Sequence, residues 1–176
     1  MRTVPLVLAA TATVLFMSAA TPAQEIPQPG PEHAKLKQLE GTWDAVVKFG
    51  TDESKGTMTY KMDLGGLWLV SDYQGEFAGQ PFRGKGLDSY DPAKKKYVSV
   101  WVDSMSVSPM ISEGTFDKDG KVLTLTGEGP GADGKPTKLK TVTEHKDKDT
   151  MLWTMFGTGP DGKEGPMLSI TYKRRK

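Results

Sequence analysis

Apolar and polar residues alternate along most of the chain after residue 41. The alternation is clearest over residues 43–49 and 58–64, where every second side chain is apolar. Because successive side chains of a β-strand point to opposite faces, this period of two predicts strands with one buried face. About ten such segments follow one another, separated by Gly, Pro and Asp turn signals. The chain is therefore predicted to be all-β.

Residues 32–40 form the one segment with convincing helical spacing. Ala34, Leu36 and Leu39 lie roughly on one face, and Gly41 ends the helix. No helix is expected between the strands, so consecutive strands should pair antiparallel through short turns. A Greek-key sandwich is the alternative, but it needs at least one long crossover. The pattern favours an antiparallel up-and-down β-barrel of about ten strands with one short N-terminal helix.

An ordered string of short motifs resembles the family called Domain of Unknown Function 1579 (DUF1579). The motifs are His33-x-x-Leu36-x-x-Leu39-x-Gly41-x-Trp43, Gly65-Gly66 with Trp68 and Leu69, Tyr73 with Gly75, Phe82-x-Gly84-x-Gly86, Tyr90-Asp91-x-x-x-Lys95-Lys96-Tyr97, and Trp101-x-Asp103-Ser104. The resemblance covers residues 32–175 and implies a calycin-like barrel without an established activity. Gly41-x-Trp43 alone also resembles the lipocalin signature and the opening of nitrobindin-type haem barrels.

The first 23 residues are built like a secretory signal peptide. Arg2 precedes an apolar run, and Thr21-Pro22-Ala23 places small residues at the −3 and −1 positions of a cleavage site. A membrane anchor is the alternative, but the run is shorter than the roughly 20 residues that a spanning helix needs. We expect a cleaved signal peptide at 1–23, a Pro-rich leader at 24–31, a barrel domain at 32–176, and secretion into a bacterial periplasm.

Composition narrows the classes of function. Arg2 is the only charged residue of the signal segment, so the remainder carries 22 basic and 22 acidic side chains. A surface of balanced charge argues against nucleic acid and against an electrostatic membrane binder. The chain has no cysteine, which removes thiol catalysis and thiolate metal sites. No segment after the signal peptide is expected to span a membrane.

The lumen of such a barrel is where a small molecule would bind. Methionine and aromatic side chains are spread over the strands, and they suit an adaptable apolar cavity. The candidate lumenal residues are Tyr60, Tyr73, Tyr97, Trp101, Asp103, Met151, Trp153 and Met155. The alternative is that these side chains fill the barrel and leave no cavity.

Two positions have structural interpretations beside their functional ones. Trp43, with Gly41 at the start of the first strand, is expected to plug the closed end beneath the helix. Asp103 shares a strand face with Trp101. It could orient a polar ligand head or act as a general base. The favoured interpretation is that it caps the strand and holds the turn at 104–108.

The two histidines do not predict a metal site. His33 and His145 have no partners spaced for zinc, and ligation of haem by His145 is disfavoured by its charged sequence neighbours. We expect no metal and no cofactor. The leading hypothesis is an exported protein that binds a small apolar or amphipathic ligand without catalysis. The alternatives are an enzyme that acts on a lipid-like molecule through Asp103, and a filled barrel that works through its surface.

Overall fold

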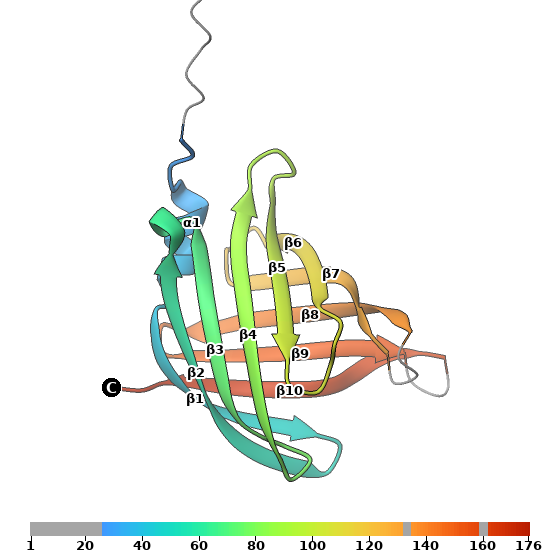
Figure 1. Cartoon of the computed structure of the whole chain (residues 1–176). Coiled ribbons are helices and arrows are strands. Elements are labelled where there is room, and N and C mark those ends of the chain that lie inside the picture. The colour runs from blue at the N-terminus through green and yellow to red at the C-terminus, as the bar shows by residue number, and fades with distance from the viewer. Residues whose placement is uncertain (1–25, 132–134, 159–161) are drawn as a thin grey trace, which may run out of the picture.

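A computed structural model describes residues 26–131, 135–158 and 162–176, so the expected signal peptide lies outside the described residues. It is a closed antiparallel barrel of ten strands, preceded by one short helix (Figure 1). The elements are α1 (Pro31–Lys37), β1 (Gly41–Phe49), β2 (Asp52–Asp63), the single 3₁₀ turn η1 (Leu64–Gly66), β3 (Trp68–Phe77), β4 (Gln80–Asp91), β5 (Lys96–Asp103), β6 (Met110–Phe116), β7 (Val122–Pro130), β8 (Pro136–Asp147), β9 (Thr150–Thr158) and β10 (Glu164–Arg174).

Every strand pairs with its neighbours in sequence, and the first strand closes the barrel against the last. The β1–β10 ladder runs from Trp43 opposite Arg174 to Phe49 opposite Leu168. Closure leaves no free sheet edge, so each strand satisfies its backbone hydrogen bonds on both sides. The predicted up-and-down barrel is confirmed, and the sandwich alternative is wrong.

The helix is shorter than the sequence predicts and buries a different face. It ends at Lys37, and Gly41 begins β1 instead of ending the helix. The Gly30 N–H donates to Nδ1 of His33 over 3.0 Å, which draws that imidazole beneath the first turn. His33 and Leu36 are therefore the buried residues, and Ala34 is exposed.

One end of the barrel is closed by Trp43 under the segment that follows α1. Its indole is 1% exposed, and Nε1 donates to the Leu39 carbonyl over 2.8 Å. The Arg174 guanidinium stacks 4.1 Å from the centre of the indole ring and donates to the carbonyls of Gln38 and Glu40. Arg174 therefore joins the last strand to the free carbonyls after the helix, where a cation is favoured.

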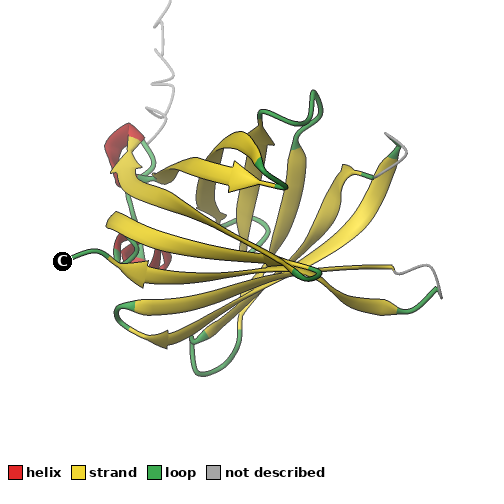
Figure 2. Ribbon diagram, turned by 90° about the horizontal axis from the view of Figure 1, so that it is seen from below, coloured by secondary structure: helices red, strands yellow, loops and turns green. Residues whose placement is uncertain are grey.

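The other end is the mouth of the barrel. The tips of the β1–β2 and β3–β4 hairpins lie there, away from α1 (Figure 1). A quarter-turn shows the helix and the 3₁₀ turn gathered at one end of the strands (Figure 2). Near these tips a hollow of about 340 Å³ is lined by Phe49, Phe77 and their neighbours. The helix-covered end is thus closed, whereas the mouth is hollowed.

Candidate functional site

Two walls of unlike side chains enclose the lumen. The large-residue wall comes from β1, β2, β9 and β10, and it consists of Trp43, Val47, Met58, Met151, Trp153, Ile170 and Tyr172. The small-residue wall comes from β4–β7. It consists of Gly84, Gly86, Ser99, Ser112 and Gly127, with Asp88 among them. Large side chains also belong to this wall, since Trp101 of β5 lies over Gly84 and Gly86, but its small polar groups have no counterpart in the large-residue wall.

Four polar or small positions of the small-residue wall face one another across consecutive strands. Asp88 of β4 lies opposite Ser99 of β5, Ser99 opposite Ser112 of β6, and Ser112 opposite Gly127 of β7. Directly opposed residues of an antiparallel pair point to the same face. This polar row therefore crosses the inner wall as one band.

The lumen is not completely filled by side chains. Tyr60, Asp88, Ser99, Trp153 and Ile170 all belong to inward faces, yet each is only half-buried. Because the ten paired strands leave no gap in the wall, the surface that these side chains leave uncovered faces the lumen. Water-sized molecules can therefore reach these side chains in the interior.

Asp88 is a carboxyl group inside the barrel, and the described residues give it no cationic partner. Burial raises its pKa to about 6, and the hydrogen bond from Ser99 offsets part of that rise. The ion pairs of the described residues lie elsewhere, on the outer face and at the ends. Among the described inward-facing positions of β2–β9 there is no lysine or arginine. The charge available in the lumen is negative.

Three phenols continue the polar interior from Asp88 toward the large-residue wall. Burial, then the Asp88 charge, raises the pKa of Tyr60. Burial likewise raises the pKa of Tyr172, with smaller contributions from Tyr60 and Tyr73. The Tyr73 hydroxyl is buried and has no hydrogen-bond partner among the described residues. Unsatisfied buried polar atoms are uncommon in proteins and mark places where water or a ligand is held.

Trp101 and Asp103 lie on the inner face of β5 toward the mouth. The Trp101 indole lies against β4, where a Cβ on Gly84 would stand 2.0 Å from Cζ2 of the ring. Its Nε1 donates to Oδ2 of Asp103 over 3.1 Å, and the Met105 N–H donates to Oδ1 over 2.9 Å. Both carboxylate oxygens are therefore engaged. These are the contacts of the strand-end cap that the sequence offered as one interpretation of Asp103.

The remaining sequence candidates divide between the lumen and the packed core. Tyr60, Trp153 and Met155 are half-buried on inward faces, while Tyr73 and Met151 are buried. Tyr97 belongs to the cluster beneath α1, and its hydroxyl donates to the Glu32 carbonyl over 3.3 Å. Gly41 has φ of +121°, a region that favours glycine.

Sequence reasoning missed Asp88 and the Ser99–Ser112 pair. The signal was present in the alternation of Phe82, Gly84, Gly86 and Asp88, which places the aspartate on the same strand face as an aromatic residue. His145 is also on an inward face, and burial lowers its pKa. Over the described residues, no group of three or more His, Asp or Glu side chains is arranged to hold a metal ion, and no helix is long and apolar enough to cross a membrane.

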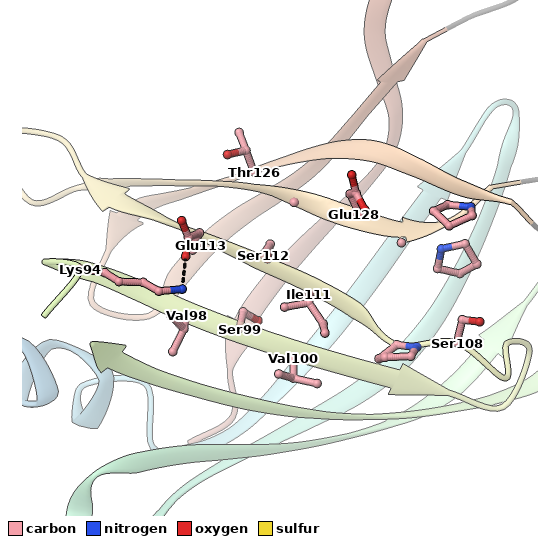
Figure 3. A pocket seen from close by; sticks show the side chains of 15 residues that line it. Lys94, Val98, Ser99, Val100, Ser108, Ile111, Ser112, Glu113, Thr126 and Glu128 are labelled. Carbon is pink, nitrogen blue, oxygen red and sulfur yellow. Dashed lines mark hydrogen bonds and ion pairs between the residues drawn. The ribbon is translucent and has the colours of Figure 1, made fainter. Parts of the chain in front are cut away.

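A second hollow, of about 530 Å³, lies on the outer surface of the barrel over β5–β7 (Figure 3). Outward-facing aliphatic side chains line it, among them Val98, Val100 and Ile111. The Lys94 ammonium and the Glu113 carboxylate bound it with an ion pair of 2.8 Å. Ser99, Ser112 and Gly127 of the polar row also border this hollow, so it lies directly behind the inner wall that carries the row.

Comparison with known proteins places the fold in a family. The model of a protein family of unknown function, DUF1579, matches residues 28–174. The chain belongs to the DUF1579 family. The barrel of this chain is the calycin-like architecture that the motifs imply, and the comparison with curated proteins gives no significant match.

The chain is similar to several solved structures at low sequence identity. Rv2717c from M. tuberculosis is 18% identical, with a TM-score of 0.61 over 84% of this chain and 99% of that protein. The S-type phycobiliprotein lyase CPES from Guillardia theta is 10% identical, with a TM-score of 0.52 over 84% and 99%. A redesigned beta barrel, mFAP1, bound to DFHBI, is 17% identical, with a TM-score of 0.43 over 80% and 98%.

Proposed function

We propose that this DUF1579 protein is exported and binds a small apolar or amphipathic molecule in its lumen without catalysing a reaction. The observation that carries the proposal is the incompletely filled interior beside the small-residue wall. A barrel that worked through its surface alone would gain stability by filling that space, because empty or water-filled volume forfeits dispersion contacts. In such a filled barrel the side chains of Trp153 and Ile170 would be fully buried, whereas both are partly exposed inside the closed wall.

The lining fits an amphipathic ligand. The large-residue wall offers aromatic and thioether surface, which is polarizable and adapts to different shapes. The polar row and the unpaired Tyr73 hydroxyl offer a few fixed polar groups on a largely apolar surface. Small-molecule sites in proteins have this composition.

A catalytic function has less support from the contacts. The carboxylate proposed from the sequence as acid or base, Asp103, already accepts two hydrogen bonds from its own strand and turn. These two contacts orient the carboxylate toward its own strand and turn, whereas a general base has to lie within hydrogen-bonding distance of the proton that it removes. Binding alone is the function that the lumen supports best.

Native mass spectrometry of the protein purified from its own host tests export and binding together. We expect a polypeptide that begins at Gln24 and carries a non-covalent small molecule, which is lost on denaturation. A chain that retains residues 1–23 would contradict export. Failure of any ligand to co-purify, together with no tryptophan fluorescence response to fatty acids, isoprenoids, haem or alkylamines, would contradict lumenal binding.

A further inference from the structure

Over β2–β9, the charges of the described inward-facing carboxylate and basic side chains are of one sign, and Arg174 of β10 is engaged by Trp43 at the closed end. Asp88 and Asp103 are the described inward-facing carboxylates of β4 and β5, and no inward-facing lysine or arginine of β2–β9 opposes them. Asp103 is engaged by Trp101 and by the backbone of Met105. Asp88 has only the Ser99 hydroxyl, so it is the carboxylate that remains available.

Among the described inward-facing residues of β2–β9, an anionic ligand head would find no lysine or arginine as counter-ion. A cationic head would find the Asp88 carboxylate. Burying a charge without a partner is costly, and a buried carboxylate is strongly stabilised when an ammonium group reaches it. Aromatic rings also surround the approach to Asp88. Tyr60 is its electrostatic neighbour, and the Trp101 indole lies along Gly84 and Gly86 of the same strand. Aromatic faces attract cations and add to the attraction of the carboxylate.

We infer that Asp88 is the counter-ion for a protonated nitrogen carried by an apolar or aromatic ligand in the lumen. The inference rests on the proposed lumenal binding and specifies the ligand class, a hydrophobic amine. The amine would pair with the Asp88 carboxylate beside Ser99 and Ser112. Its apolar part would lie against the large-residue wall, within reach of the unpaired Tyr73 hydroxyl for a second polar group.

The groups around Asp88 predict how binding depends on pH. Of the neighbouring elements, β2 presents Tyr60, β5 presents Ser99 and Tyr97, and β4 itself presents Tyr90. The helix, which packs on β4, presents His33, whose Nδ1 accepts the Gly30 N–H. None of these places a cation on Asp88. Asp88 loses its proton near pH 6, while an alkylamine stays protonated to well above pH 8, so amine binding should strengthen between pH 5 and pH 8.

The experiment compares three ten-carbon probes that share a tail and differ in head charge: decylamine, decanol and decanoate. Binding to ligand-free, refolded protein is measured by tryptophan fluorescence and calorimetry at pH 8 and pH 5. We expect decylamine to bind at least tenfold more tightly than decanol at pH 8, with decanoate weakest. The preference for decylamine should fall several-fold at pH 5. This part needs no variant, so it remains decisive even if a substitution prevents folding.

Asp88→Asn should remove the preference for decylamine over decanol while leaving decanol binding in place. Asp72→Asn is the matched control, because Asp72 is a carboxylate on the outer face of the adjacent strand, paired with Lys85. That variant should keep the full preference. Equal binding of decylamine and decanol by the wild-type protein, or tightest binding of decanoate, would overturn the inference and leave lumenal binding standing. Binding of none of the three would overturn both.

Discussion

The same alternation of inward-facing and outward-facing side chains forms both walls of the lumen, yet the two walls differ in burial and in polarity. The large-residue wall of β1, β2, β9 and β10 contains fully buried side chains, including Trp43 and Met151, both 1% exposed. The small-residue wall of β4–β7 presents Gly, Ser and Asp88 to the same interior, and Asp88 and Ser99 stay half-buried. The comparison separates the strands that carry the fully buried Trp43 and Met151 from the strands whose polar groups are proposed to bind a ligand.

The largest expected effect comes from the large-residue wall. Trp43→Ala should lower the free energy of unfolding by about 3–5 kcal/mol, because it removes a fully buried ring and the stacking of Arg174 on it. Trp101→Ala, on the other side of the lumen, removes a half-buried indole and should cost about 2 kcal/mol. Urea denaturation of both variants measures the difference. Equal losses would mean that the two walls share the work of stabilising the barrel.

A smaller effect is expected when a methyl group is added to a glycine of the small-residue wall that lies against a large side chain. Gly84→Ala places a Cβ 2.0 Å from Cζ2 of Trp101, so the indole ring has to move away from β4. We expect a loss of about 2–3 kcal/mol, in the range of overpacked cores, with a changed near-ultraviolet circular dichroism spectrum. Gly165→Ala is the control, since no atom lies within 4 Å of its added Cβ. An unchanged Gly84→Ala spectrum would show that the indole is not held by β4.

The barrel could be predicted from the sequence because its evidence is local. A period of two and a turn every few residues specify strands and antiparallel neighbours without knowledge of distant contacts. Trp43 could also be placed, since it follows directly from the helix that it supports. The helix boundary was less predictable, because the burial of His33 depends on the Gly30 N–H and on the strands beneath it.

The candidate site could be predicted only in part, because its members meet across strands. Tyr60 and Trp153 were recognisable as aromatic residues on alternating faces, but the room around them depends on the small residues opposite. Asp88 is a candidate for binding because it faces Ser99 on the next strand and has no nearby cation among the described residues. The sequence favoured a strand-end cap over a free carboxylate for Asp103, and the contacts with Trp101 and Met105 are those of a cap.

Asp88 gives a further test of the comparison between the two walls. A carboxylate buried for ligand binding should lower the free energy of unfolding of the ligand-free protein. Its pKa is about 6 in the folded protein against an ordinary value of 3.8, so the folded state holds a proton that the unfolded chain releases between about pH 4 and pH 6. The stability linked to that proton is present below the unfolded pKa and is lost as pH rises through the folded pKa. At pH 8 the ionised carboxylate should therefore cost about 2 kcal/mol, once the shift is discounted for partial exposure.

Asp88→Asn, which cannot ionise, should consequently raise the free energy of unfolding of the ligand-free protein by about 2 kcal/mol at pH 8. Near pH 4 the gain should vanish, because the folded wild-type protein then carries a neutral Asp88. Asp72→Asn should behave in the opposite sense, with a small loss at pH 8, because Lys85 lowers the pKa of Asp72 on the outer face. Denaturant titrations of the three proteins across this pH range measure the effect. A stabilisation at pH 8 that coincides with loss of amine preference would assign Asp88 to binding at the expense of stability; a destabilisation at both pH values would make it a structural member of the wall.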